Sequence, residues 1–116
     1  MKKERWTMNE NKIEHPLQDD ILREFGTRSD MRIWRNNTGM ARRGKYQVRF
    51  GVVRQADISG RYHDGRRIEI ECKSPHKKRT DAQIAWAEMI QKFNGIYILA
   101  YSIEDVRKTF NELIRP

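Results

Sequence analysis

The chain has 116 residues, of which 37% are hydrophobic and 34% charged, and its formal net charge is +8. A chain of this length buries roughly 65% of its unfolded surface, which is enough for one core but not for two. No apolar run approaches the roughly 20 residues of a membrane span, and the N-terminus lacks the apolar stretch of a signal peptide, so we expect a cytoplasmic protein with no membrane partner. Cys72 is the only cysteine, so no internal disulfide can form.

The N-terminal quarter predicts a tail followed by a helix. Residues 1–12 are polar and unpatterned, which is typical of a flexible tail, so we place the domain at 13–116. A helix is expected from His15 to Phe25, with Pro16 in its first turn and Gly26 at its end. Its apolar residues recur every four positions: Leu17, Ile21 and Phe25.

The next segment predicts one strand, a turn and a basic loop. Met31–Arg35 alternates between apolar and polar residues, as a half-buried strand does. Asn36–Gly39 has the composition of a turn and opens a glycine-flanked basic loop at Met40–Lys45. A short strand is expected at Val48–Val53.

A β-hairpin is the clearest local prediction. Asp57–His63 forms its first arm, Asp64-Gly65 its tight turn, and Arg66–Lys73 its second arm. Strand alternation divides the second arm between two faces. One face carries Ile68, Ile70 and Cys72, and the other carries Arg67, Glu69, Glu71 and Lys73. We expect Cys72 to be a small core residue.

The C-terminal part predicts a helix, a strand and a helix. The second helix is expected at Thr80–Asn94, with Thr80 and Gln83 as a capping box. Its buried side should hold Ile84, Trp86, Ala87, Ile90 and Phe93. Ile96–Tyr101 predicts a buried strand, and Ile103–Ile114 a final helix. This order favours an α/β domain with a mixed central sheet flanked by helices.

Positive charge is concentrated in the middle of the chain. No acidic residue occurs between Asp30 and Asp57, a stretch that holds Arg32, Arg35, Arg42, Arg43, Lys45, Arg49 and Arg54. Such a local field suits a polyanion such as nucleic acid. A surface that only keeps a protein in solution usually mixes both signs, and an anionic membrane would require an amphipathic helix with a bulky apolar face.

Three residues of the hairpin suggest metal-assisted chemistry. Glu71 and Lys73 share one face, and Asp57 opens the facing arm, so both carboxylates should lie at the same end of the ribbon. Two such carboxylates suit Mg²⁺, which acidifies a bound water and stabilises charge on a phosphate. Lys73 could orient that water or stabilise the transition state. The simpler interpretation is a surface hairpin with weak cross-strand ion pairs. We favour the site because of the adjacent basic stretch.

These residues resemble a known family. Asp57 followed fourteen positions later by Glu71-Cys72-Lys73 is similar to the divided signature of the PD-(D/E)xK, or restriction-endonuclease-like, nucleases. Supporting features place the resemblance closest to the VRR-NUC branch, the virus-type replication-repair nucleases. They are the Arg35–Gly39 turn, Phe50-Gly51 ahead of Asp57, Gln83 on the helix after Lys73, and Ile103–Asp105 after the last strand. The resemblance extends over about residues 12 to 110.

The resemblance implies a restriction-endonuclease-like fold and a DNA endonuclease that depends on Mg²⁺ or Mn²⁺. Small members of the branch imply a homodimer that cuts branched DNA, as a Holliday-junction resolvase does, in a bacterial or phage-infected cell. Two alternatives stay open. One is a nickase or a nuclease subunit of a repair or restriction assembly. The other is a non-catalytic DNA-binding module, against which the paired carboxylates argue because they would repel phosphate.

The resemblance also assigns roles to residues. The metal ligands would be Glu14, Asp57, Glu71 and the backbone carbonyl of Cys72. Lys73 would be the catalytic lysine, and Gln83 would place water or phosphate unless it serves only as a helix cap. The first-helix acids that could substitute for Glu14 are Asp19, Asp20 and Glu24. We expect DNA contacts from Arg35, Asn37, Arg42, Arg43, Lys45, Arg49, Arg54, Lys77 and Lys78. Trp86 and Phe93 are expected in the core.

Overall fold

A mixed four-stranded sheet forms the centre of the protein in a computed structural model that describes residues 7–8, 15–36, 39–50 and 55–115. The strand order is β2-β5-β6-β7, with β2 at Met31–Arg35, β5 at Ile58–Tyr62, β6 at Arg67–Cys72 and β7 at Ile96–Ala100. β6 and β7 pair in parallel, and the other neighbours are antiparallel. The predicted α/β domain with a mixed sheet is therefore confirmed.

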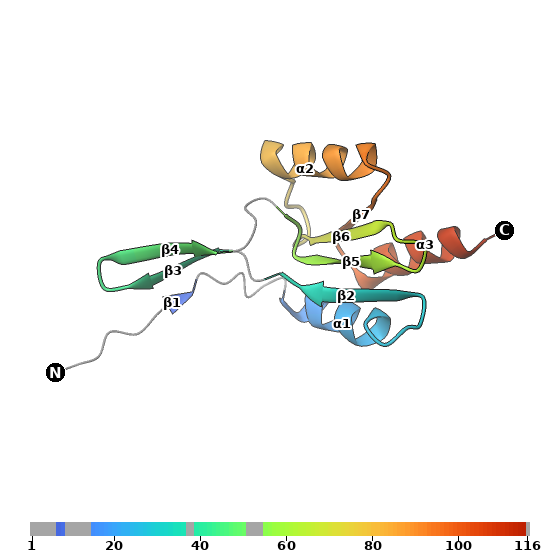
Figure 1. The fold of residues 1–116 in the computed structure, drawn as a ribbon, viewed down its shortest axis with the longest axis horizontal. Helices are drawn as coiled ribbons and strands as arrows, with labels where there is room; N and C mark the ends of the chain where they lie inside the picture. The colour runs from blue at the N-terminus through green and yellow to red at the C-terminus, as the bar shows by residue number, and fades with distance from the viewer. Residues whose placement is uncertain (1–6, 9–14, 37–38, 51–54, 116) are drawn as a thin grey trace.

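Three helices flank this sheet (Figure 1): α1 at His15–Phe25, α2 at Asp81–Lys92 and α3 at Ile103–Ile114. α1 and α3 have the bounds expected from the sequence. α2 lies on the opposite face of the sheet from α1 and α3. No helix in the described part of the chain is long and apolar enough to cross a membrane.

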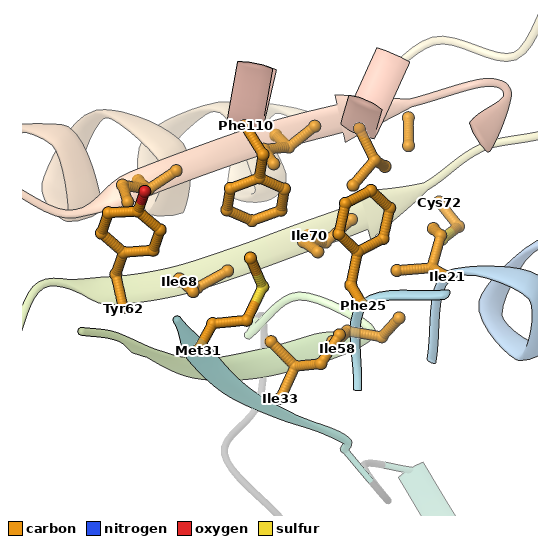
Figure 2. Close-up of a cluster of buried hydrophobic side chains, with 14 residues drawn as sticks. Ile21, Phe25, Met31, Ile33, Ile58, Tyr62, Ile68, Ile70, Cys72 and Phe110 are labelled. Atoms are coloured by element: carbon orange, nitrogen blue, oxygen red, sulfur yellow. The ribbon is translucent and has the colours of Figure 1, made fainter. Parts of the chain in front are cut away.

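The hydrophobic core lies between the sheet and the pair α1 and α3 (Figure 2). Phe25 from α1 and Phe110 from α3 meet there, with ring centroids 5.2 Å apart. Ile68, Ile70 and Cys72 are each fully buried beneath them, which confirms the predicted apolar face of β6. Burying one such side chain contributes roughly 1.5–3 kcal/mol, so this face supplies the main hydrophobic stabilisation.

The α2 side of the sheet differs from the prediction. Ala87 and Ile90 are buried as expected, but Phe93 is 73% exposed and Ile84 36% exposed. The expectation that Phe93 is a core residue is therefore wrong. Phe93 is the C-cap residue of α2, and its backbone N–H still donates to the Met89 carbonyl at 3.1 Å, so it continues the last helical turn with its ring exposed.

A separate three-stranded sheet contains the largest difference from the sequence prediction. Its order is β1-β3-β4, with β1 at Thr7–Met8, β3 at Gly39–Arg43 and β4 at Tyr46–Phe50. The basic loop expected at Met40–Lys45 is therefore mostly a strand, and the strand expected from Val48 begins at Tyr46. Within the expected tail, Thr7–Met8 instead pair with β3. We call residues 39–50 the arm.

The arm is a β-hairpin closed by two residues. Arg43 pairs with Tyr46, which leaves Gly44 and Lys45 as the loop. Gly44 has φ 57°, a conformation that a two-residue hairpin turn requires and that glycine adopts without strain. In Figure 1 the arm projects away from the central sheet.

Candidate active site

Asp57 and Glu71 lie at the same end of the β5–β6 hairpin. The register pairs Ile58 with Ile70, so one further step brings Asp57 opposite Glu71. Asp57 Oδ2 accepts a hydrogen bond of 2.8 Å from the backbone N–H of Cys72, which turns its carboxylate toward β6. The Asp57 carboxylate is thus held by the backbone of β6.

Gln83 joins Glu71 to the start of α2. Its Oε1 accepts from the backbone N–H of Thr80 at 2.9 Å, and the Thr80 hydroxyl accepts from the Gln83 backbone N–H at 3.2 Å, so the predicted capping box is confirmed. Its Nε2 donates to Glu71 Oε1 at 3.2 Å. One amide therefore caps the helix and also orients a carboxylate that is only 5% exposed.

Lys73 follows directly after β6. Its backbone N–H donates to the carbonyl of Ala100 at 2.9 Å, which continues the β6–β7 pairing one residue beyond β6. Alternation along the strand places its half-buried side chain on the same face as Glu71. The Lys73 side chain is therefore expected to point to the side of the sheet that carries Glu71.

Tyr97 is a site residue that the sequence analysis missed. Burial raises the pKa of its phenol to about 12, and the negative charges of Glu71 and Asp57 add to the rise. The Arg79 guanidinium, 5.7 Å from the ring centroid, lowers the pKa of Tyr97 and so reduces this rise. Among the described residues, the buried Tyr97 hydroxyl has no hydrogen-bond partner in adequate geometry.

The parallel register explains why Tyr97 lies there. β7 pairs Tyr97 with Glu69 and Leu99 with Glu71, so Tyr97 shares the face of both glutamates. Its position could have been found from the sequence only by assuming that β7 runs parallel to β6 in this register.

A divalent cation fits this chemistry. Asp57 and Glu71, which are oriented by the Cys72 N–H and by Gln83, supply the hard oxygen ligands that Mg²⁺ prefers, and Mg²⁺ keeps several waters in such sites. Among the described residues, no group of three His, Cys, Asp or Glu side chains gathers around a possible metal position. The proposed third acid, Glu14, lies outside the described residues.

The alternative first-helix acids are engaged with arginines. Asp19 pairs with Arg35, Asp20 Oδ1 lies 3.4 Å from Arg23 Nη1, and Glu24 Oε2 accepts from Arg107 Nε at 2.8 Å. These ion pairs connect α1 to β2, to itself and to α3. They give none of the three a contact to the Asp57–Glu71 pair.

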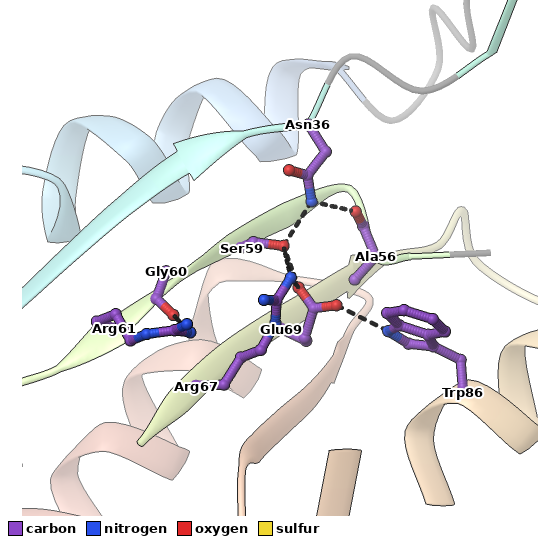
Figure 3. A network of polar contacts seen from close by, with 8 residues as sticks. All are labelled: Asn36, Ala56, Ser59, Gly60, Arg61, Arg67, Glu69 and Trp86. Carbon is purple, nitrogen blue, oxygen red and sulfur yellow. Dashed lines mark hydrogen bonds and ion pairs between the residues drawn. The ribbon is translucent and has the colours of Figure 1, made fainter. Parts of the chain in front are cut away.

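A buried polar network adjoins the site on the same face of the sheet (Figure 3). Glu69 is fully buried; its Oε1 accepts from Trp86 Nε1 at 2.7 Å, and its Oε2 accepts from the Ser59 hydroxyl. Asn36 Nδ2 donates to Ser59 Oγ at 2.6 Å, and Arg67 Nη2 lies 3.8 Å from Glu69 Oε2. Glu69 was expected only as a polar-face residue, whereas it joins β2, β5 and β6 to α2.

The predicted DNA-binding residues fall in three places. Arg35 is tied to α1, since its Nε donates to Gln18 Oε1 at 2.8 Å and its guanidinium pairs with Asp19. This hydrogen bond to Arg35 holds the pKa of the Asp19 carboxyl below its ordinary value. Lys77 and Lys78 are exposed in the segment between β6 and α2.

The remaining predicted contacts belong to the arm and its surroundings. Arg43 and Lys45 are exposed at the arm's tip. The side chains of Arg42 and Arg49, and the positions of Asn37 and Arg54, lie outside what the structure describes. Basic side chains are thus presented both beside the site and on the arm.

The chain matches no protein-family model, and no curated protein or solved structure shows significant similarity to it. The functional assignment therefore depends on the residues of the site.

Proposed function

We propose that this protein is a divalent-metal-dependent DNA endonuclease with a restriction-endonuclease-like fold, similar to the VRR-NUC branch. The observation that carries the proposal is that Asp57 Oδ2 accepts a hydrogen bond from the Cys72 N–H, which brings its carboxylate to the end of β6 between Glu71 and Lys73. Glu71 is buried and Asp57 is half-buried, and two carboxylates at one end of a hairpin supply the oxygen ligands that Mg²⁺ prefers.

Each side chain has a distinct role. Asp57, Glu71 and the carbonyl of Cys72 would hold Mg²⁺ or Mn²⁺, which when bound acidifies a water and neutralises phosphate charge. The backbone N–H of Cys72 fixes one oxygen of Asp57, and Gln83 fixes one oxygen of Glu71. Lys73 places a positive charge where charge develops on the phosphate during hydrolysis.

The distribution of basic residues supports DNA as the substrate. Exposed Lys77 and Lys78 precede α2 next to the site, and the arm adds exposed Arg43 and Lys45. We propose branched DNA as the preferred form. Because one site cuts one strand, symmetric resolution of a four-way junction requires two sites, and a two-fold homodimer provides them.

The test is cleavage of an end-labelled four-way junction beside a linear duplex of the same sequence, each with Mg²⁺, Mn²⁺ or EDTA. We expect metal-dependent, symmetric cuts in the junction. Cutting of both substrates would retain the nuclease and reject the preference for junctions. Tight binding with no cutting under any condition would contradict the nuclease and favour a binding module.

A further inference from the structure

The arm is attached to the site end of the central sheet. The chain leaves the sheet after β2 and re-enters it at Asp57, so the arm is inserted into the chain at the end of the sheet that carries a proposed metal ligand (Figure 1). The points of departure and return are joined, because the Asn36 backbone N–H donates to the Asp57 carbonyl at 2.8 Å and Asn36 Nδ2 to the Ala56 carbonyl at 2.8 Å. The arm therefore extends from the same end of the sheet as the site.

The tip of the arm combines positive charge with an exposed aromatic ring. Arg43 and Lys45 are exposed, and Tyr46 is 65% exposed. Residues 39–50 contain no acidic side chain. A cationic tip with an unpacked ring suits a partner that offers both anionic groups and flat aromatic faces, and nucleic acid offers both.

The dimensions of the arm suit a DNA groove. Its strands of five residues each extend roughly 17 Å, which exceeds the roughly 8.5 Å depth of the major groove. That groove, about 12 Å wide, admits a two-stranded β-ribbon. An arm of this length can therefore reach the bases from the mouth of the groove.

We infer that the arm inserts into DNA at a branch point, where Arg43 and Lys45 contact phosphates and Tyr46 stacks on a base that is not fully stacked in the helix. The inference rests on the proposed function for its choice of DNA. A continuous duplex presents no free base face to Tyr46, whereas a branch point does. The arm thus gives a physical reason for preferring branched over linear DNA.

Binding measured without cleavage tests the role of Tyr46. Fluorescence anisotropy of a labelled four-way junction and a linear duplex is measured in a Lys73→Ala background with Mg²⁺. We expect Tyr46→Ala to weaken junction binding by about 5- to 100-fold while duplex binding stays within about twofold, and Tyr46→Phe to bind as the parent does. Phe93→Ala removes a similarly exposed ring at the C-cap of α2 and should leave both affinities unchanged.

The salt dependence of binding tests the charges. Arg43→Gln with Lys45→Gln should reduce the slope of log K against log salt by up to about 1.8 on both DNAs, at about 0.9 for each lost phosphate contact. Lys92→Gln with Lys108→Gln removes two charges from exposed positions on α2 and α3 and should leave the slope unchanged.

Several outcomes would overturn the inference. The first is a Tyr46→Ala protein that binds the junction as tightly as its parent. The second is an equal loss of affinity for the junction and the duplex. The third is a change from dimer to monomer when the arm variants are examined by sedimentation, which would mean that the tip contacts a second copy of the chain. The arm result does not depend on catalysis. If the wild-type protein cleaves neither DNA but Tyr46→Ala weakens binding to the junction alone, the role of the arm in binding would be supported and the nuclease activity contradicted.

Discussion

Replacing Trp86 with phenylalanine should destabilise the protein through a single lost donor. Trp86 Nε1 donates to Glu69 Oε1 at 2.7 Å, and Glu69 is fully buried. Phenylalanine retains an aromatic ring but no N–H, so the carboxylate keeps the Ser59 hydroxyl and the more distant Arg67. Hydrogen bonds to charged groups contribute about 1.5–3 kcal/mol, so we expect the free energy of unfolding to fall by about 2–3 kcal/mol. That is a large part of the roughly 5–15 kcal/mol that typically stabilises a domain.

Urea denaturation followed by circular dichroism measures this change. Trp34→Phe is the matched control, because Trp34 is 46% exposed, and its effect should stay within about 0.5 kcal/mol. In the Trp86→Phe background, Glu69→Gln should cost less than it does alone, because the amide carries no buried charge. A Trp86→Phe protein as stable as wild type, or strict additivity of the two changes, would refute the role assigned to this network.

Three further predictions concern the core and two titrating groups. Ile70→Ala, in the centre of the core, should lower the free energy of unfolding by about 2–5 kcal/mol in the same urea assay; a change below about 1 kcal/mol would contradict the packing. The Asp19 pKa is lowered by Arg35, so its contribution to stability is present above its ordinary value of 3.8 and lost as the pH falls through the lowered value. Asp19→Asn should therefore be less stable than wild type at neutral pH, and the difference should vanish in acid. A difference that stays constant with pH would contradict a stabilising ion pair between Asp19 and Arg35. Glu71→Gln should lower the pKa of Tyr97 from about 12, measured as phenolate absorbance against a Tyr97→Phe reference. An unchanged pKa would mean that the charge of Glu71 does not act on Tyr97.

Short sequence motifs predicted the hairpin and the helix start that they themselves form. The Asp64-Gly65 signal correctly predicted a hairpin, but its two-residue turn is wrong, because Arg61 pairs with Arg67 and the Tyr62 N–H donates to the Arg66 carbonyl. The turn therefore contains three residues, His63–Gly65, and the register differs by one residue from the predicted one. The Thr80 capping box placed the start of α2 and brought Gln83 into the site. In both cases the decisive residues are close together in the sequence.

Features that depend on tertiary contacts were not predictable in this way. β3 has no apolar alternation, so its basic residues have the composition of a loop, and its strand conformation depends on pairing with β4 and β1. The burial of Glu69 needs partners from other elements, Ser59 on β5 and Trp86 on α2. Tyr97 reaches the site only through the parallel β6–β7 register. These three features therefore depend on pairing between residues that are far apart in the sequence.

Single-turnover cleavage by Lys73→Ala tests the central claim most directly, with Lys108→Ala as a control that removes an exposed lysine from α3. Excess protein is mixed with labelled junction DNA and Mg²⁺, and binding is measured separately by anisotropy. We expect Lys73→Ala to bind the junction like wild type but to cleave it at least about 100-fold more slowly, as when a single group that stabilises transition-state charge is removed, while Lys108→Ala cleaves normally. Wild-type cleavage by Lys73→Ala would contradict the assignment of the site.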